Sequence, residues 1–221
     1  MTAMRPLGWL GVARLGLVQM ALGAVVVLTT TTFNRVMVVE MAMPAMLPGA
    51  LVAVHYAMGL LRPRWGHGSD RSRRRTPWIV GGVAVLALGG FLAAAATALM
   101  ATSPAGGVAL AFAAFVLIGA GVGAAGTSLL ALLSARVAAE RRPAAATIVW
   151  LMMIFGLAAT AATAGALLDP FSPGRLMAVA GGVSAIALAL TLLAVWGVEG
   201  APAPVSQPRA QVPFAQAFAE T

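Results

Sequence analysis

Long apolar stretches, separated by arginine-rich segments, restrict the folds that this chain can adopt. Six stretches of about membrane-spanning length follow one another. They cover residues 15–39, 46–61, 77–100, 108–133, 144–167 and 176–196. The second is short for a span, so we expect it to extend toward Trp65. Since only 9% of the residues are charged, a soluble domain would leave much of this apolar surface in contact with water.

The sequence therefore predicts an all-α polytopic membrane protein with about six transmembrane helices. We expect one six-helix bundle over residues 1–200. Residues 201–221 are rich in Pro and Ala, which is typical of a linker or a cytoplasmic tail.

The arginines predict the orientation of the bundle. The densest charged block, residues 65–75, separates the second and third apolar stretches. Each charge at a bilayer centre costs roughly 2.5–3.5 kcal/mol, so we expect this block to be a loop outside the membrane. With the N-terminus in the cytoplasm, only Arg35 and Arg175 of the 14 basic residues fall on the far side. The positive-inside rule thus favours both termini in the cytoplasm.

The net charge of +8 suits topology and contact with anionic lipid in the bilayer. No basic patch with interleaved aromatic residues, of the kind that binds single strands, is visible in the sequence. We therefore predict no nucleic-acid partner.

The charged block has the spacing Gly-x-x-x-Asp-Arg-x-x-Arg-Arg, formed by Gly66, Asp70, Arg71, Arg74 and Arg75. This spacing resembles the motif between helices two and three of the major facilitator superfamily, although Arg73 stands where the superfamily has glycine. Glycine permits close backbone approach, and arginine can anchor to lipid phosphate. We favour this interpretation over a basic loop that serves topology alone.

A second, shorter copy of the motif follows the fifth apolar stretch. Gly165 and Asp169 repeat the Gly-x-x-x-Asp spacing, and Arg175 follows them. Two copies of three spans each would be inverted relative to one another, as in each half of a major-facilitator transporter. The sequence thus predicts a 3+3 inverted repeat.

Glycines in the fourth stretch match a dinucleotide-binding string, Gly121-x-Gly123-x-x-Gly126. No strand precedes them and the surroundings are apolar, so the strand–turn–helix unit that binds a dinucleotide phosphate is missing. Gly119, Gly123 and Gly126 instead form a small-residue face, which favours close helix packing. The alternative is a smooth surface for a flat macrocycle.

Polar residues within or near the spans are candidates for contact with a pigment or another cargo. His55 is suited to ligating a chlorophyll-type magnesium, although a hydrogen-bonded structural histidine is the favoured interpretation. Asn34, Arg35 and Glu40 near the outer end of the first span are either functional or an interfacial pair. No metal-binding cluster or catalytic set is visible in the sequence, and we predict that the protein is not an enzyme.

The chain resembles the N-terminal half of PucC/LhaA-type proteins, the bacteriochlorophyll-delivery branch of the major facilitator superfamily. The resemblance is carried by residues 33–45, 55–70, 75–78, 148–153 and 168–176. The most distinctive of these strings is Leu168-Asp-Pro-Phe-Ser-Pro-Gly-Arg-Leu176.

The resemblance implies a factor in a bacterial inner or photosynthetic membrane that helps assemble light-harvesting complexes. It implies bacteriochlorophyll as the cofactor or cargo, and antenna polypeptides as partners. It also implies about twelve spans, so we expect a C-terminal half or a second copy as a further partner. Two alternatives remain open: a small-molecule transporter, and a structural subunit of a photosynthetic complex.

Overall fold

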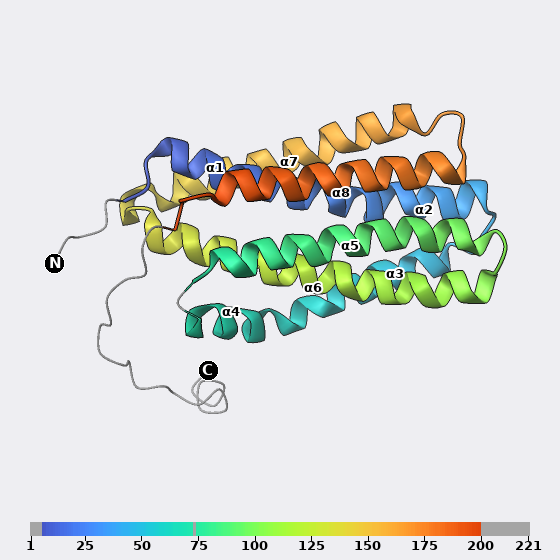
Figure 1. The fold of residues 1–221 in the computed structure, drawn as a ribbon, viewed down its shortest axis with the longest axis horizontal. Coiled ribbons are helices and arrows are strands. Elements are labelled where there is room, and N and C mark those ends of the chain that lie inside the picture. Colours follow the sequence, from blue (N-terminus) through green and yellow to red (C-terminus); the bar gives the residue numbers. More distant parts are fainter. Residues whose placement is uncertain (1–5, 73, 200–221) are drawn as a thin grey trace.

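The computed structural model describes residues 6–72 and 74–199, and the predicted tail at 201–221 lies outside them. Helices account for nearly all of the described chain (Figure 1). The α-helices are α1 (Trp9–Val27), α2 (Phe33–Arg35), α3 (Met46–Ala57), α4 (Arg62–Arg71), α5 (Thr76–Met100), α6 (Pro104–Arg136), α7 (Arg142–Leu167) and α8 (Pro173–Val195). Proline stands in the first turn of α5, α6, α7 and α8, where its missing N–H leaves no intrahelical bond unmade.

Five helical segments in the described part of the chain are long and apolar enough to cross a membrane. They are Trp9–Glu40, Thr76–Met100, Pro104–Arg136, Ala139–Leu167 and Pro173–Val195. The protein is thus an all-α, multi-pass membrane protein. The second predicted span, 46–61, is not among them. It consists of α3 and the 3₁₀ turn Met58–Leu61 and continues directly into the polar α4, so its apolar part is shorter than the others.

The first span is a continuous helix of changing pitch. Two π-helical segments, Leu28–Thr32 and Val36–Glu40, enclose α2. Thr29 and Thr30 both donate their hydroxyls to the carbonyl of Val26, at 2.7 and 3.0 Å. Threonine side chains that bond back to the preceding turn compete with the regular helical ladder, which accounts for the widening at this point.

The helices pack as two interlocking sets of three. In one set α1 packs against α7 and α8; in the other α6 packs against α5 and the α3–α4 segment, and α5 also packs against α8. This pattern of contacts stays the same when the first three spans are exchanged with the last three. The exchange replaces α1 with α6, α3–α4 with α7, and α5 with α8. The packing is therefore of the kind that the predicted 3+3 repeat requires.

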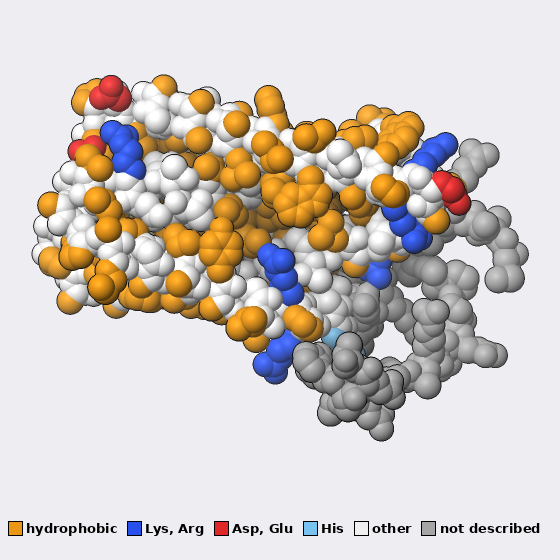
Figure 2. All heavy atoms as spheres, turned by 180° about the vertical axis from the view of Figure 1, so that it is seen from behind, with side chains coloured by type: hydrophobic (Ala, Val, Ile, Leu, Met, Phe, Trp, Pro, Cys, Tyr) orange, Lys and Arg blue, Asp and Glu red, His pale blue; other side chains and the backbone are white. Residues whose placement is uncertain are grey.

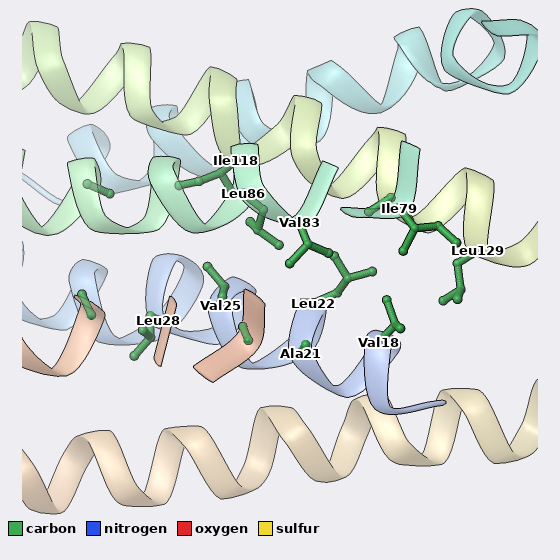
Figure 3. Packing of buried hydrophobic residues seen from close by; sticks show 14 of the residues in the cluster. Val18, Ala21, Leu22, Val25, Leu28, Ile79, Val83, Leu86, Ile118 and Leu129 are labelled. Atoms are coloured by element: carbon green, nitrogen blue, oxygen red, sulfur yellow. The ribbon is translucent and has the colours of Figure 1, made fainter. Parts of the chain in front are cut away.

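The core lies where α1 meets α5 and α6. Figure 3 shows Val18, Leu22 and Val25 of α1 directed toward Val83 and Leu86 of α5. All five side chains are buried. Glycines bring α5 and α6 closer still, since a Cβ atom at Gly82 would lie 2.6 Å from the backbone nitrogen of Ala125. Small residues let two membrane helices gain dispersion contacts along their backbones.

Candidate functional site

One end of the bundle carries the beginning of α1, α4, the α6–α7 connection and the end of α8 (Figure 1). Hydrophobic side chains cover the middle of the face in Figure 2, and the acidic side chains visible there lie at its two ends. We call the end that carries α4 the arginine-rich end, because Arg62, Arg64, Arg74, Arg136 and Arg141 belong to its segments. The opposite end carries the α7–α8 turn and the beginning of α3.

The prediction of a loop at residues 65–75 is wrong for most of that segment, which is helical. Residues Arg62–Arg71 form α4, so Gly66 and Asp70 lie in a helix, and only a short turn separates α4 from α5. The charges do not prevent this helix, since α4 continues the second span beyond its apolar part. The side chains of Asp70 and Arg71, and the whole of Arg73, lie outside the described part of the structure.

Glycines in α4 permit close contacts with its neighbours. A Cβ atom at Gly68 would lie 2.7 Å from the indole of Trp78, and one at Gly66 would lie 3.4 Å from the Thr127 methyl. The Trp78 indole N–H donates to the Ser72 hydroxyl at 3.0 Å. These contacts hold α4 against α6 and against the beginning of α5.

Glu199, which sequence reasoning did not single out, joins three helices at the arginine-rich end. Its carboxylate accepts hydrogen bonds from the backbone N–H groups of Arg75 and, at 2.9 Å, Thr76, at the N-terminus of α5. Its backbone carbonyl accepts from the Arg136 guanidinium of α6. A carboxylate in this position satisfies unpaired N–H groups and complements the helix dipole. The sequence gives only a weak indication of this role, namely a single acidic residue just after the sixth apolar stretch.

Arg75 extends this junction to the side of α6, since its guanidinium donates to the backbone carbonyl of Ala131. Burial raises the pKa of Glu199, but the hydrogen bonds from Arg75 and Thr76 and the nearby charge of Arg74 outweigh it. The net effect lowers the pKa below its ordinary value of 4.5.

We expect Glu199→Gln to reduce thermal stability at neutral pH by about 0.5–1 kcal/mol, after allowance for solvent screening. Because the folded-state pKa is lowered, the stabilisation is complete above pH 4.5 and is lost as the pH falls through the folded-state value. Thermal unfolding of both proteins in detergent at pH 7 and pH 3 measures the difference. An equal difference at both pH values would contradict this role.

His55 is buried between α3 and the rest of the bundle. Only 5% of its surface is exposed, and its Nδ1 has no hydrogen-bond partner. The Tyr56 ring meets the imidazole edge-on, with 4.8 Å between centroids. A buried imidazole nitrogen without a partner differs from the hydrogen-bonded structural histidine that the sequence favours.

The second span covers two of the three glycines on the small-residue face of α6. A Cβ atom at Gly119 would lie 2.6 Å from the backbone oxygen of His55, and one at Gly123 would collide with the Trp65 indole. Gly126 has open space around it. Gly119 and Gly123 therefore receive α3 and Trp65, which leaves no free surface there for a flat macrocycle.

Arg35 and Glu40 form an ion pair of 3.8 Å at the other end of the bundle, with side chains 62% and 29% exposed. Exposed pairs of this kind contribute at most about 1 kcal/mol. Asn34 donates its amide to the Thr30 carbonyl at 2.8 Å, and its buried Oδ1 has no partner. No hydrogen bond or ion pair recorded in the described part of the chain joins these residues to His55.

The second motif lies at the α7–α8 turn. Ser172 caps α8 by accepting from the Arg175 N–H at 3.2 Å, and the Arg175 guanidinium donates to the Pro170 carbonyl at 2.8 Å. Gly165, Asp169 and Arg175 are all exposed. Asp169 and Arg175 line a cavity of about 680 Å³ between α7 and α8.

Relatives of known name match most of the chain. The "Bacteriochlorophyll synthase 44.5 kDa chain" of Rhodobacter capsulatus is 58% identical over 193 residues, which is 87% of this chain and 45% of that relative. "Protein PucC" of the same organism is 35% identical over 212 residues, covering 90% and 45%. "Protein PucC" of Cereibacter sphaeroides is 32% identical over 200 residues, covering 84% and 43%.

The chain thus spans less than half the length of these relatives. The sequence pattern described as "PUCC protein" matches residues 32–221, which include the predicted second to sixth spans and both Gly-x-x-x-Asp motifs. The match agrees with the resemblance found in the sequence, and this chain belongs to the PUCC protein family.

Proposed function

We propose that this chain acts in a membrane assembly factor for photosynthetic light-harvesting complexes, handling bacteriochlorophyll and delivering it to antenna polypeptides. The proposal places the chain in the bacterial inner or photosynthetic membrane, with the arginine-rich end in the cytoplasm. The name of the most similar relative reported above refers to bacteriochlorophyll synthesis, which supports a role with this pigment.

The distribution of the acidic side chains is the observation that carries the proposal. The acidic side chains that the structure describes, Glu40, Glu140, Asp169 and Glu199, belong to the two ends of the bundle. This arrangement suits an apolar cargo that enters from the lipid, whereas a carrier of polar solutes requires polar groups at the membrane centre.

The word "synthase" in one relative's name raises the question of catalysis. We propose a role without a chemical step. The separation of the described carboxylates between the two ends supports this, because general acid–base chemistry needs groups within hydrogen-bond reach of one substrate.

His55 is the residue that we propose to hold the pigment. Its unpartnered, buried Nδ1 fits the neutral imidazole donor that a chlorophyll magnesium accepts. When bound, the pigment supplies light absorption and the magnesium that the imidazole ligates. Asn34, with its buried and unpartnered Oδ1, is a second polar contact in the same proposal.

The exposed faces of the second and fifth spans suit a further protein partner. Trp150, Leu151 and Ile154 of α7 are all about half exposed or more, as are Tyr56 and Leu60 in the second span. We propose that these faces meet the remainder of a longer protein, as in a major-facilitator fold, or a second copy of this chain.

Purification of the tagged chain from cells that make bacteriochlorophyll tests the pigment role. We expect the pigment's absorption bands to elute with the protein in a fixed ratio, and to be absent after purification from cells that make none. A colourless protein from pigmented cells, folded by circular dichroism, would contradict the proposal.

A further inference from the structure

A continuous groove runs along the bundle between α7 and α8. The cavity of about 680 Å³ near the α7–α8 turn shares Thr163, Val183 and Ile186 with a second cavity of about 230 Å³. The second cavity, unlike the first, is also lined by α1, through Met20, Ala21 and Ala24. The groove therefore opens between two neighbouring helices and is closed from behind by α1.

The mouth of the groove carries one charge of each sign. Asp169 follows α7 and Arg175 lies in the first turn of α8, and both line the larger cavity. They do not form an ion pair with each other; the Arg175 guanidinium donates to the Pro170 carbonyl instead. The N-terminus of α8 adds its positive dipole end on the Arg175 side. A positive and a negative side chain therefore lie at the mouth of the apolar groove without pairing with each other.

The dimensions suit a lipid chain. From Arg175 to Leu190, which lines the inner cavity, the helix rises about 22 Å at roughly 1.5 Å per residue. Half of a hydrocarbon core of about 30 Å is about 15 Å. The groove thus reaches through one leaflet and past the membrane centre.

We propose that the α7–α8 groove is a binding site for one zwitterionic phospholipid. Its phosphate meets Arg175 and the N-terminus of α8, its amine meets Asp169, and one acyl chain lies along the groove against α1. The complementarity of both charges selects a zwitterionic headgroup over an anionic one. The anionic headgroup has no amine, so it leaves the Asp169 carboxylate without a partner beside the negative phosphate. This site is separate from His55 and does not depend on the pigment role.

Native mass spectrometry of the full chain tests the proposal, after exchange into vesicles of equal parts phosphatidylethanolamine and phosphatidylglycerol. We expect one phosphatidylethanolamine per chain to survive detergent extraction. Arg175→Gln should lower its retention about tenfold, in line with the loss of a charge-assisted hydrogen bond. Asp169→Asn should remove the preference between the two lipids while keeping one lipid bound.

Filling the groove provides a test that leaves the charges intact. Gly182 lines the larger cavity, and a Cβ atom there would have no neighbour within 4 Å, so Gly182→Leu should fold normally and lose the bound lipid. Gly81→Leu on α5 is the matched control, since Gly81 also has open space and lies away from the groove. Equal lipid retention in both variants, equal retention of both lipids by the unaltered protein, or a pigment in place of the lipid would overturn the proposal.

Discussion

Gly121→Val is expected to prevent stable folding of the bundle. Gly121 is buried in α6 against α5, and a Cβ atom there would lie 2.6 Å from the backbone oxygen of Gly82. A backbone atom cannot move aside as a flexible side chain can, so α5 and α6 must separate along their shared length. We expect a loss of about 3 kcal/mol, at the upper end of the usual cost of overpacking.

Gly126→Val is the matched control for this prediction. The two glycines lie in the same helix, but a Cβ atom at Gly126 would have no neighbouring atom within 4 Å. Valine has a somewhat better helix propensity than glycine, so this variant should be as stable as the unaltered protein. Detergent-solubilised yield and thermal unfolding measure both effects. Equal stability of the two variants would contradict the close α5–α6 contact.

His55→Ala is expected to remove most of the pigment that elutes with the purified chain. Changes in the groups that merely support a metal ligand already cost about 10- to 100-fold in metal affinity, so loss of the ligand itself should cost at least about tenfold. The absorption of bacteriochlorophyll relative to that of protein at 280 nm measures the occupancy. The fold should persist, since the Nδ1 of His55 makes no hydrogen bond that the alanine would break.

His67→Ala separates ligation from a general effect of losing a histidine. His67 is exposed in α4, and its replacement should leave the pigment ratio unchanged. If His55→Ala keeps its full pigment while remaining folded, the imidazole does not ligate the magnesium. The same result in both variants would likewise exclude His55 as the ligand.

The apolar stretches allowed the helices to be placed closely, because a membrane demands long, uninterrupted spans. The expected limits 77–100, 144–167 and 176–196 lie close to α5, α7 and α8. Prolines at the helix starts helped, since they mark first turns. Helix α6 extends beyond the expected 108–133 at both ends, because its terminal residues are less apolar but continue the same hydrogen-bond ladder.

The arginine-rich segment shows where this reasoning fails. Charge reports where a segment leaves the hydrocarbon, but it does not report where the helix ends. Residues 62–71 therefore remain helical outside the predicted apolar span. Glu199 was missed for a related reason: its partners are backbone N–H groups more than a hundred residues earlier in the sequence, and no local pattern encodes such a contact.

The packing role of the α6 glycines was easier to predict from the sequence than the structure of the arginine-rich segment. Spacing alone favours helix packing at Gly119, Gly123 and Gly126. The structure places α3 and Trp65 against the first two, but it places no neighbour against Gly126. Spacing did not indicate that Gly126 faces open space while Gly121 meets α5. That distinction depends on the rotation of α6 about its axis, which its neighbours determine.

Deletion of the gene in its photosynthetic host, followed by absorption spectra of the membranes, tests the central claim most directly. An assembly factor that delivers bacteriochlorophyll should leave the host with strongly reduced antenna bands, restored by the unaltered gene and not by a His55→Ala copy. The pigment bands of free bacteriochlorophyll should remain, because its synthesis is not the proposed step. Unchanged antenna spectra in the deletion strain would contradict the account.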